Sequence, residues 1–159
     1  MIIKFAKLRE DVKIPERANP SDAGMDVFYN DLYEREVPLF PGDSCLLGTG
    51  IKLEIPHGYM IEVKNRSSIA AKKDLIIKSC VCDPGFAGEI LINLHNIGKH
   101  FQKIVPGDKI AQLVMIPVVH FRISEVEEEK LYDEQVAMSN RREGGFGSTD
   151  VKTKEKTVK

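Results

Sequence analysis

Cysteine, long apolar runs and net charge are all scarce in this sequence. Its 3 cysteines are an odd number, and no C-x-x-C pair accompanies a second Cys or His cluster. A zinc site is therefore not expected. We expect instead that the thiols are reduced, as is typical of a cytosolic protein. The 23 Lys and Arg residues nearly balance the 24 Asp and Glu residues, giving a net charge of -1. This balance argues against a nucleic-acid partner, because no excess of positive charge is present.

No segment is long and apolar enough to suggest a membrane-spanning helix. The longest uncharged run, Ile110–Phe121, is shorter than the roughly 20 residues that such a helix needs, and it contains Pro117. The first residues, Met1–Lys7, lack the extended apolar stretch of a signal peptide. We expect a soluble, cytoplasmic protein without a membrane partner.

The residues that are present predict one all-β domain. A chain of 159 residues with 42% apolar and 30% charged residues is ordinary for a globular domain. Apolar and polar residues alternate over residues 51–55, 59–64 and 90–95, which is the pattern of half-buried strands. Pro-Gly turns recur between such segments, at Pro41-Gly42 and Pro106-Gly107 for example. Many short strands separated by turns favour a β-sandwich or barrel.

Two segments carry helical signals. Ser67–Lys73 places hydroxyls first and cations last, an order that suits the helix dipole, and predicts one short helix. Ser124–Glu127 resembles a capping box before Glu128–Met138, but apolar spacing there is poor. The acidic residues 125–134 therefore favour a solvated connector over a helix.

Composition divides the chain into three parts. Residues 1–139 form the predicted β-barrel domain, and residues 140–150 form a glycine-rich arm. Residues 151–159 carry several lysines and are expected to be disordered.

Two early segments contain residues suited to binding phosphate or a metal. Asp22–Asp26 holds two carboxylates that could bind Mg²⁺ directly or through water, or could simply cap their own turn. Arg66 with Ser67 and Ser68 could bind an anion, or could form an ordinary helix N-cap with a surface arginine.

Two later segments add a candidate base and a polar residue in an apolar strand. A hairpin is expected around Pro84-Gly85, with Asp83 either a general base or the first residue of a β-turn. Phe86 could pack on a sugar or a base. Gln112 interrupts an apolar strand, so its amide is expected to be buried and bonded to backbone or to a ligand phosphate.

The glycine-rich arm has the composition of a flexible lid. Phe146 could stack on a ligand while Gly147, Ser148 and neighbouring amides surround a phosphate and Arg141 adds charge. The alternative is a low-complexity linker.

In this order and spacing, the five segments together resemble the motifs of the homotrimeric deoxyuridine triphosphate nucleotidohydrolase (dUTPase) family. The matching segments are Asp22–Asp26, Arg66–Ala70, Val81–Ile90, Ile110–Val114 and Arg141–Thr149. The resemblance implies a jelly-roll-like β-barrel of the dUTPase type with one short helix and a flexible C-terminal arm. It also implies a homotrimer whose sites are shared between chains, with the arm closing a neighbouring site.

The activity that the resemblance implies is that of a dUTP diphosphatase. Water attacks the α-phosphate of dUTP, which yields dUMP and pyrophosphate with Mg²⁺ as cofactor. The reaction limits uracil in DNA and supplies dUMP for dTMP synthesis.

Site roles follow from the same resemblance, residue by residue. Asp83 matches the carboxylate that activates water, and Asp26 matches one near the metal's waters. Phe86 stands where the family usually has Tyr, under the deoxyribose. The matching substrate-binding positions are Arg66, Ser67, Ser68, Phe86, Gln112, Arg141, Phe146, Gly147 and Ser148.

Two other functions remain as alternatives. A dCTP deaminase of the same fold would need a catalytic Glu on the strand after Gly88, where this chain has Asn93. A nucleotide-sensing trimer that regulates a protein partner would retain the same binding residues.

Overall fold

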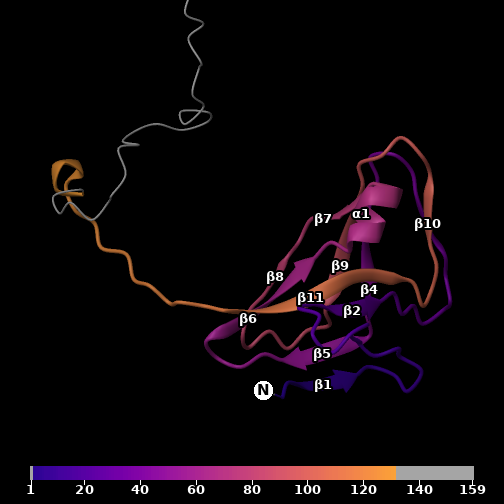
Figure 1. The fold of residues 1–159 in the computed structure, drawn as a ribbon, viewed down its shortest axis with the longest axis horizontal. Helices are drawn as coiled ribbons and strands as arrows, with labels where there is room; N and C mark the ends of the chain where they lie inside the picture. The colour runs from indigo at the N-terminus through magenta and orange to yellow at the C-terminus, as the bar shows by residue number, and fades with distance from the viewer. Residues whose placement is uncertain (1, 132–159) are drawn as a thin grey trace, which may run out of the picture. The chain divides into compact units, whose positions relative to one another are not determined.

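Short β-strands make up most of the regular structure in the computed structural model, which describes residues 2–131 (Figure 1). The chain divides into a compact unit up to His120 and a second unit that begins at Phe121. The elements of the first unit, in order, are β1 (Lys4–Lys7), β2 (Met25–Phe28), β3 (Val37–Leu39), β4 (Ser44–Gly48), β5 (Ile51–Glu54), β6 (Tyr59–Lys64), α1 (Ser67–Lys73), β7 (Leu75–Ile77), β8 (Val81–Cys82), β9 (Leu91–Asn96), β10 (Gln102–Ile104) and β11 (Lys109–Pro117).

The strands form four small antiparallel sheets. The largest has the order β2-β11-β6-β8, and a three-stranded sheet has the order β4-β9-β7. Two-stranded sheets pair β1 with β5 and β10 with β3. In Figure 1, β1 and β5 lie at one end of the unit and α1 lies at the other. The predicted all-β class with one short helix is confirmed.

The inward faces of these strands build the core. On β9, Ile92 and Leu94 are fully buried while Leu91 is exposed, because successive side chains of a strand point to opposite faces. Ile61 and Val63 of β6 are buried in the same way. The three strands predicted by alternation are confirmed.

Helix α1 has the predicted bounds, but serine does not cap it. The N-cap residue is Arg66, whose backbone carbonyl accepts hydrogen bonds from the N–H groups of Ile69 and Ala70 at 3.0 and 2.9 Å. No side-chain cap is formed, so the alternative of an ordinary capped helix is wrong. Ser67 and Ser68 lie in the first turn with both residues exposed.

The predicted hairpin around Pro84-Gly85 is wrong, although its turn is correct. Gly85 has a φ of +84° and Phe86 N–H donates to Asp83 C=O at 3.2 Å, which makes Asp83 the first residue of a β-turn. The flanking strands nevertheless belong to different sheets, since β8 pairs with β6 while β9 pairs with β4 and β7. Residues 83–90 therefore cross from one sheet to the other.

The described part of the second unit is exposed throughout. Residues 121–131 contain one 3₁₀ turn, η1 (Glu128–Lys130), beside a Lys130–Glu127 ion pair of 2.6 Å. This agrees with the connector interpretation for these residues. The rest of that segment and the predicted domain boundaries lie outside the described residues. No helix in the described part of the chain is long and apolar enough to cross a membrane.

Candidate functional site

Asp26 on β2 is held by two cations, one at the start of α1 and one on β11 of the same sheet. Arg66, which follows β6, donates from Nε to Oδ1 at 2.7 Å and from Nη2 to Oδ2 at 3.2 Å. Lys109 at the start of β11 lies 3.0 Å from Oδ2 through its Nζ. The Asp26 and Arg66 side chains are only 14% and 25% exposed, so this fork-shaped pair is partly shielded from water.

These contacts determine the charge state of Asp26. Partial burial alone would raise the pKa of its carboxyl, but the hydrogen bonds and charges of Arg66 and Lys109 outweigh it and lower the pKa. The hydrogen bonds to Glu16 and to Asp26 raise the pKa of Lys109. Carboxylate and ammonium therefore stay charged together near neutral pH.

Gln112 lies beside this pair, in the middle of the sheet. On β11 it is opposite Asp26 of β2 on one side and Lys64 of β6 on the other. Its Nε2 donates to the backbone carbonyl of Asn65 at 2.8 Å. The residue is half-buried rather than buried, which corrects the sequence prediction, and its amide partner is backbone.

The structure thus joins three of the five motifs. Asp26, Arg66 and Gln112 come from the first, second and fourth matching segments, and Lys109 directly precedes the fourth; we call these four residues the polar cluster. Asp22 has a different role: its carboxylate accepts hydrogen bonds from the Asn19 backbone N–H at 2.9 Å and from the Asn19 side chain. The turn-capping alternative therefore describes Asp22, whereas Asp26 faces cations.

The third motif forms a separate hollow, which we call the Asp83 pocket. It is lined by Leu46, Val63, Ser79, Val81, Cys82, Asp83, Phe86, Glu89, Ile90 and Leu91. Asp83 is exposed at its rim. Phe86 is 48% exposed as a residue, and its ring lies against Gly88, where an added Cβ would be 2.5 Å from the ring. No member of the polar cluster lines this pocket.

Two residues near the site were missed by the sequence analysis. Lys109 has no local signal in the sequence, and only the fold brings its Nζ to within 3.0 Å of Asp26 Oδ2. Glu89 lines the Asp83 pocket and its Oε1 accepts a hydrogen bond from Gly50 N–H at 2.6 Å. That contact links the crossing segment to the β4–β5 turn, a long-range pairing without any local signal in the sequence.

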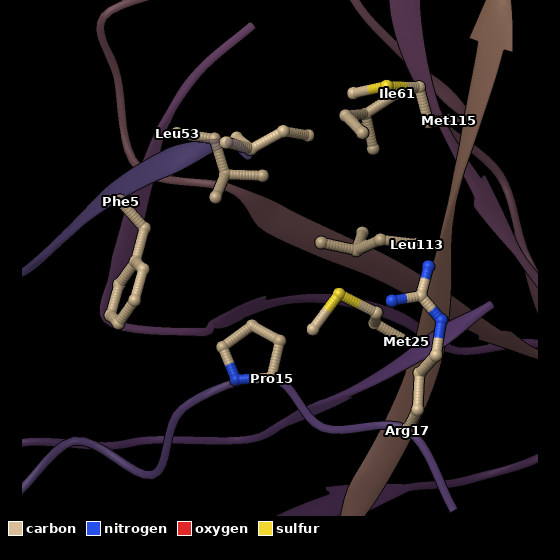
Figure 2. Close-up of a pocket in the computed structure, with 9 residues that line it drawn as sticks. Phe5, Pro15, Arg17, Met25, Leu53, Ile61, Leu113 and Met115 are labelled. Carbon is tan, nitrogen blue, oxygen red and sulfur yellow. The ribbon is translucent and has the colours of Figure 1, made fainter. Parts of the chain in front are cut away.

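A further pocket, shown in Figure 2, is apolar. Phe5 and Leu53 line it on one side, and Met25 and Leu113 on another. Among the described residues, Arg17 is the one charged residue that lines it, and the guanidinium Nε of Arg17 donates to the backbone carbonyl of Asp22 at 2.8 Å. None of the predicted site residues that fall within residues 2–131 lines this pocket.

The arm residues Arg141, Phe146, Gly147 and Ser148 lie outside the described residues. Within residues 2–131, no group of three or more His, Cys, Asp or Glu side chains could enclose a metal ion. Asp26 still offers carboxylate oxygens, and Mg²⁺ is commonly held by one carboxylate, phosphates and its own waters. The residues present therefore fit a magnesium ion that arrives with a phosphate ligand.

An all-β unit with a carboxylate–guanidinium cluster and a separate carboxylate–aromatic pocket is suited to binding a phosphorylated ligand. The dUTPase family model matches residues 10–150 of this chain. The chain is 39% identical to the deoxyuridine 5'-triphosphate nucleotidohydrolase of Alkaliphilus metalliredigens, over 94% of this chain and 98% of that protein. It is 36% identical to the corresponding protein of Crocosphaera subtropica, over 95% and 100%.

A solved structure agrees with these relatives. The dUTPase of Staphylococcus bacteriophage 80alpha with dUPNHPP superposes with a TM-score of 0.78 at 27% identity, over 94% of this chain and 99% of that one. This chain belongs to the dUTPase family.

Proposed function

We propose that this protein hydrolyses dUTP to dUMP and pyrophosphate, with Asp83 activating the water that attacks the α-phosphate. The proposal is carried by one observation: the polar cluster gathers a guanidinium, an ammonium, an amide and a carboxylate from three separate segments. Phosphoryl transfer depends mainly on positioning and charge stabilisation, which such a cluster supplies.

Asp83 is suited to act as the base because it is exposed at the rim of an otherwise largely apolar pocket. A carboxylate there can accept a proton from water as the oxygen attacks phosphorus. Phe86 in the same pocket offers a flat apolar face for the deoxyribose. A 2′-hydroxyl against that face would crowd the ring, so ribonucleotides would bind less well.

Arg66 and Gln112 would bind the phosphates, together with the hydroxyls of Ser67 and Ser68. The guanidinium fork matches phosphate as well as it matches the Asp26 carboxylate. Asp26 would contact Mg²⁺ through water, and the bound ion would offset negative charge on the triphosphate. Arg141, Phe146, Gly147 and Ser148 would complete the site from the arm.

We further propose that the active unit is a homotrimer in which different chains supply the polar cluster and the Asp83 pocket. In support, the two sets of residues share no lining residue within the described chain. Leu46 and Val81, at the Asp83 pocket, are 65% and 55% exposed, as expected for a surface covered by a second copy.

A direct assay tests the activity. Pyrophosphate release should be rapid with dUTP and Mg²⁺ and much slower with UTP, dTTP or dCTP. Asp83→Asn should lower kcat by about 100-fold or more, since it removes the base and keeps the shape. Ammonia release from dCTP would instead indicate the deaminase, and full activity of Asp83→Asn would contradict the role of Asp83.

Mixing two inactive variants tests the shared site. Asp83→Asn and Arg66→Ala chains, unfolded and refolded together in equal amounts, should regain about a quarter of wild-type activity, because chance assembly joins the two intact parts in that fraction of sites. Each variant refolded alone is the control. A mixture that stays inactive would contradict a site built from more than one chain.

A further inference from the structure

We propose that Lys109 is a positioning residue that keeps Asp26 paired when Arg66 turns to the phosphates of the substrate. The inference rests on the proposed function, in which Arg66 binds phosphate and Asp26 stays in place near the metal's waters. Lys109 would act through these two residues, without contacting the nucleotide.

A β-bulge brings Lys109 to the correct face of the sheet. The register between β11 and β2 places Gln112 opposite Asp26 and Ala111 opposite Val27, but Lys109 opposite Phe28. Ile110 is therefore the extra residue of the bulge. Phe28 and Asp26 are two residues apart and share a face, so Lys109 also points to that face. Without the bulge, Lys109 would point to the opposite side.

The Lys109 ammonium is held where it can form an ion pair with Asp26 without help from Arg66. Its Nζ lies 3.0 Å from Asp26 Oδ2 and 2.8 Å from Glu16 Oε1. The two carboxylates are linked through their backbones, since Asp26 N–H donates to Glu16 C=O at 2.7 Å and Glu16 N–H donates in return at 3.1 Å. The centre of the Phe28 ring lies 5.6 Å from the ammonium, so a cation–π interaction also stabilises the ammonium.

Arg66 is the partner that is free to exchange. The guanidinium contacts Asp26 through side-chain bonds alone, at 2.7 and 3.2 Å, and a phosphate can accept the same two N–H groups. If Arg66 were the sole counterion, its transfer would leave a carboxylate that is 14% exposed without a partner. Lys109 removes that cost, so the cluster can bind phosphate without unpairing Asp26.

The inference predicts a specific loss on removing the ammonium. Lys109→Met should weaken binding of a non-hydrolysable dUTP analogue with Mg²⁺ by about tenfold, and raise KM for dUTP similarly, because Arg66 is then retained by Asp26. Lys109→Arg restores a cation and should bind within about threefold of wild type. Lys103→Met, which removes a cation 2.9 Å from Glu36, is the matched control and should bind normally.

A double variant separates this role from simple stabilisation. In an Asp26→Asn background there is no carboxylate to keep paired, so adding Lys109→Met should cause no further loss of affinity. An unchanged affinity of Lys109→Met, or an equal loss in both backgrounds, would overturn the inference. Should Lys109→Met not fold, Lys109→Gln provides the same comparison. Absence of dUTP hydrolysis by the wild-type protein would overturn the proposed function instead.

Discussion

Gly24 leaves the space that the side chain of Gln112 occupies. A Cβ on Gly24 would lie 2.3 Å from Gln112 Oε1 and 3.1 Å from Gln112 Cβ. No ordinary contact is that short, so any larger residue at position 24 must displace the carboxamide. The glycine of the first motif is thus required by a residue of the fourth.

Gly24→Ala should therefore impair catalysis more than folding. A displacement of the phosphate-binding amide by about 1 Å is expected to lower kcat/KM by about 10- to 100-fold. Steady-state kinetics with dUTP measure this effect, and circular dichroism checks that the strands are retained. Wild-type kinetics for Gly24→Ala would show that the position of Gln112 does not affect turnover.

Phe86 provides a test of sugar selection. Phe86→Ala removes the apolar face and should raise the ratio of UTP to dUTP turnover, in kcat/KM, by about tenfold or more. Phe86→Tyr keeps the ring and should leave the ratio near the wild-type value. If Phe86→Ala discriminates as well as wild type, the ring does not exclude the 2′-hydroxyl.

Asp26 should make stability depend on pH. Its carboxyl has a lowered pKa in the folded protein, so its charged form stabilises the fold above the unfolded-state pKa of about 3.9. That stabilisation is lost as the pH falls through the folded-state pKa. Asp26→Asn should therefore be less stable than wild type at pH 7, and the difference should shrink in acid.

Urea unfolding at pH 7 and at pH 3, at one protein concentration, measures that difference. Asp22→Asn is a suitable control, because Asp22 caps its own turn and pairs with neither Arg66 nor Lys109. A difference for Asp26→Asn that is the same at both pH values would contradict the proposed linkage.

Asn96 is expected to be the most sensitive amide in the core. It is fully buried, its Nδ2 donates to the carbonyls of Leu39 and His100 at 3.0 and 2.9 Å, and its Oδ1 accepts from Gly98 N–H at 3.0 Å. Asn96→Ala should lower the free energy of unfolding by about 2–4 kcal/mol, since it leaves three backbone groups unpaired.

Exposed Asn19 provides the comparison for that variant. Asn19→Ala should change the free energy of unfolding by less than about 0.5 kcal/mol, as surface substitutions usually do. Chemical unfolding measures both variants. Equal effects would mean that the Asn96 network contributes little.

Local sequence patterns predicted where the strands and turns of this fold lie better than they predicted which strands pair with one another. Alternation identified β6 and β9 because each has one buried face, and Pro84-Gly85 identified the turn after Asp83. The hairpin prediction failed because strand pairing is decided by long-range packing: β8 completes the sheet beside β6, and β9 lies between β4 and β7.

The polar cluster shows the same limit. Residue types made Asp26, Arg66 and Gln112 candidates, the resemblance to the dUTPase motifs gave them roles, and the fold brings them together. The apolar neighbours of Gln112 suggested burial, but Val114 and Ile116, on its own face of β11, are half-exposed. Lys109 was missed because its direction depends on a bulge that no short sequence pattern specifies.

The position of β8 also bears on solubility. In the part of the chain that the structure describes, this two-residue strand pairs with β6 alone, so its other backbone edge is open. Open edges attract strands of other molecules and promote aggregation, a tendency that short length and the nearby Pro84 oppose. Since Val81 and Cys82 also line the Asp83 pocket, a nucleotide held there would shield the same edge. Substrate binding would then help to keep this edge from pairing with strands from outside the proposed trimer.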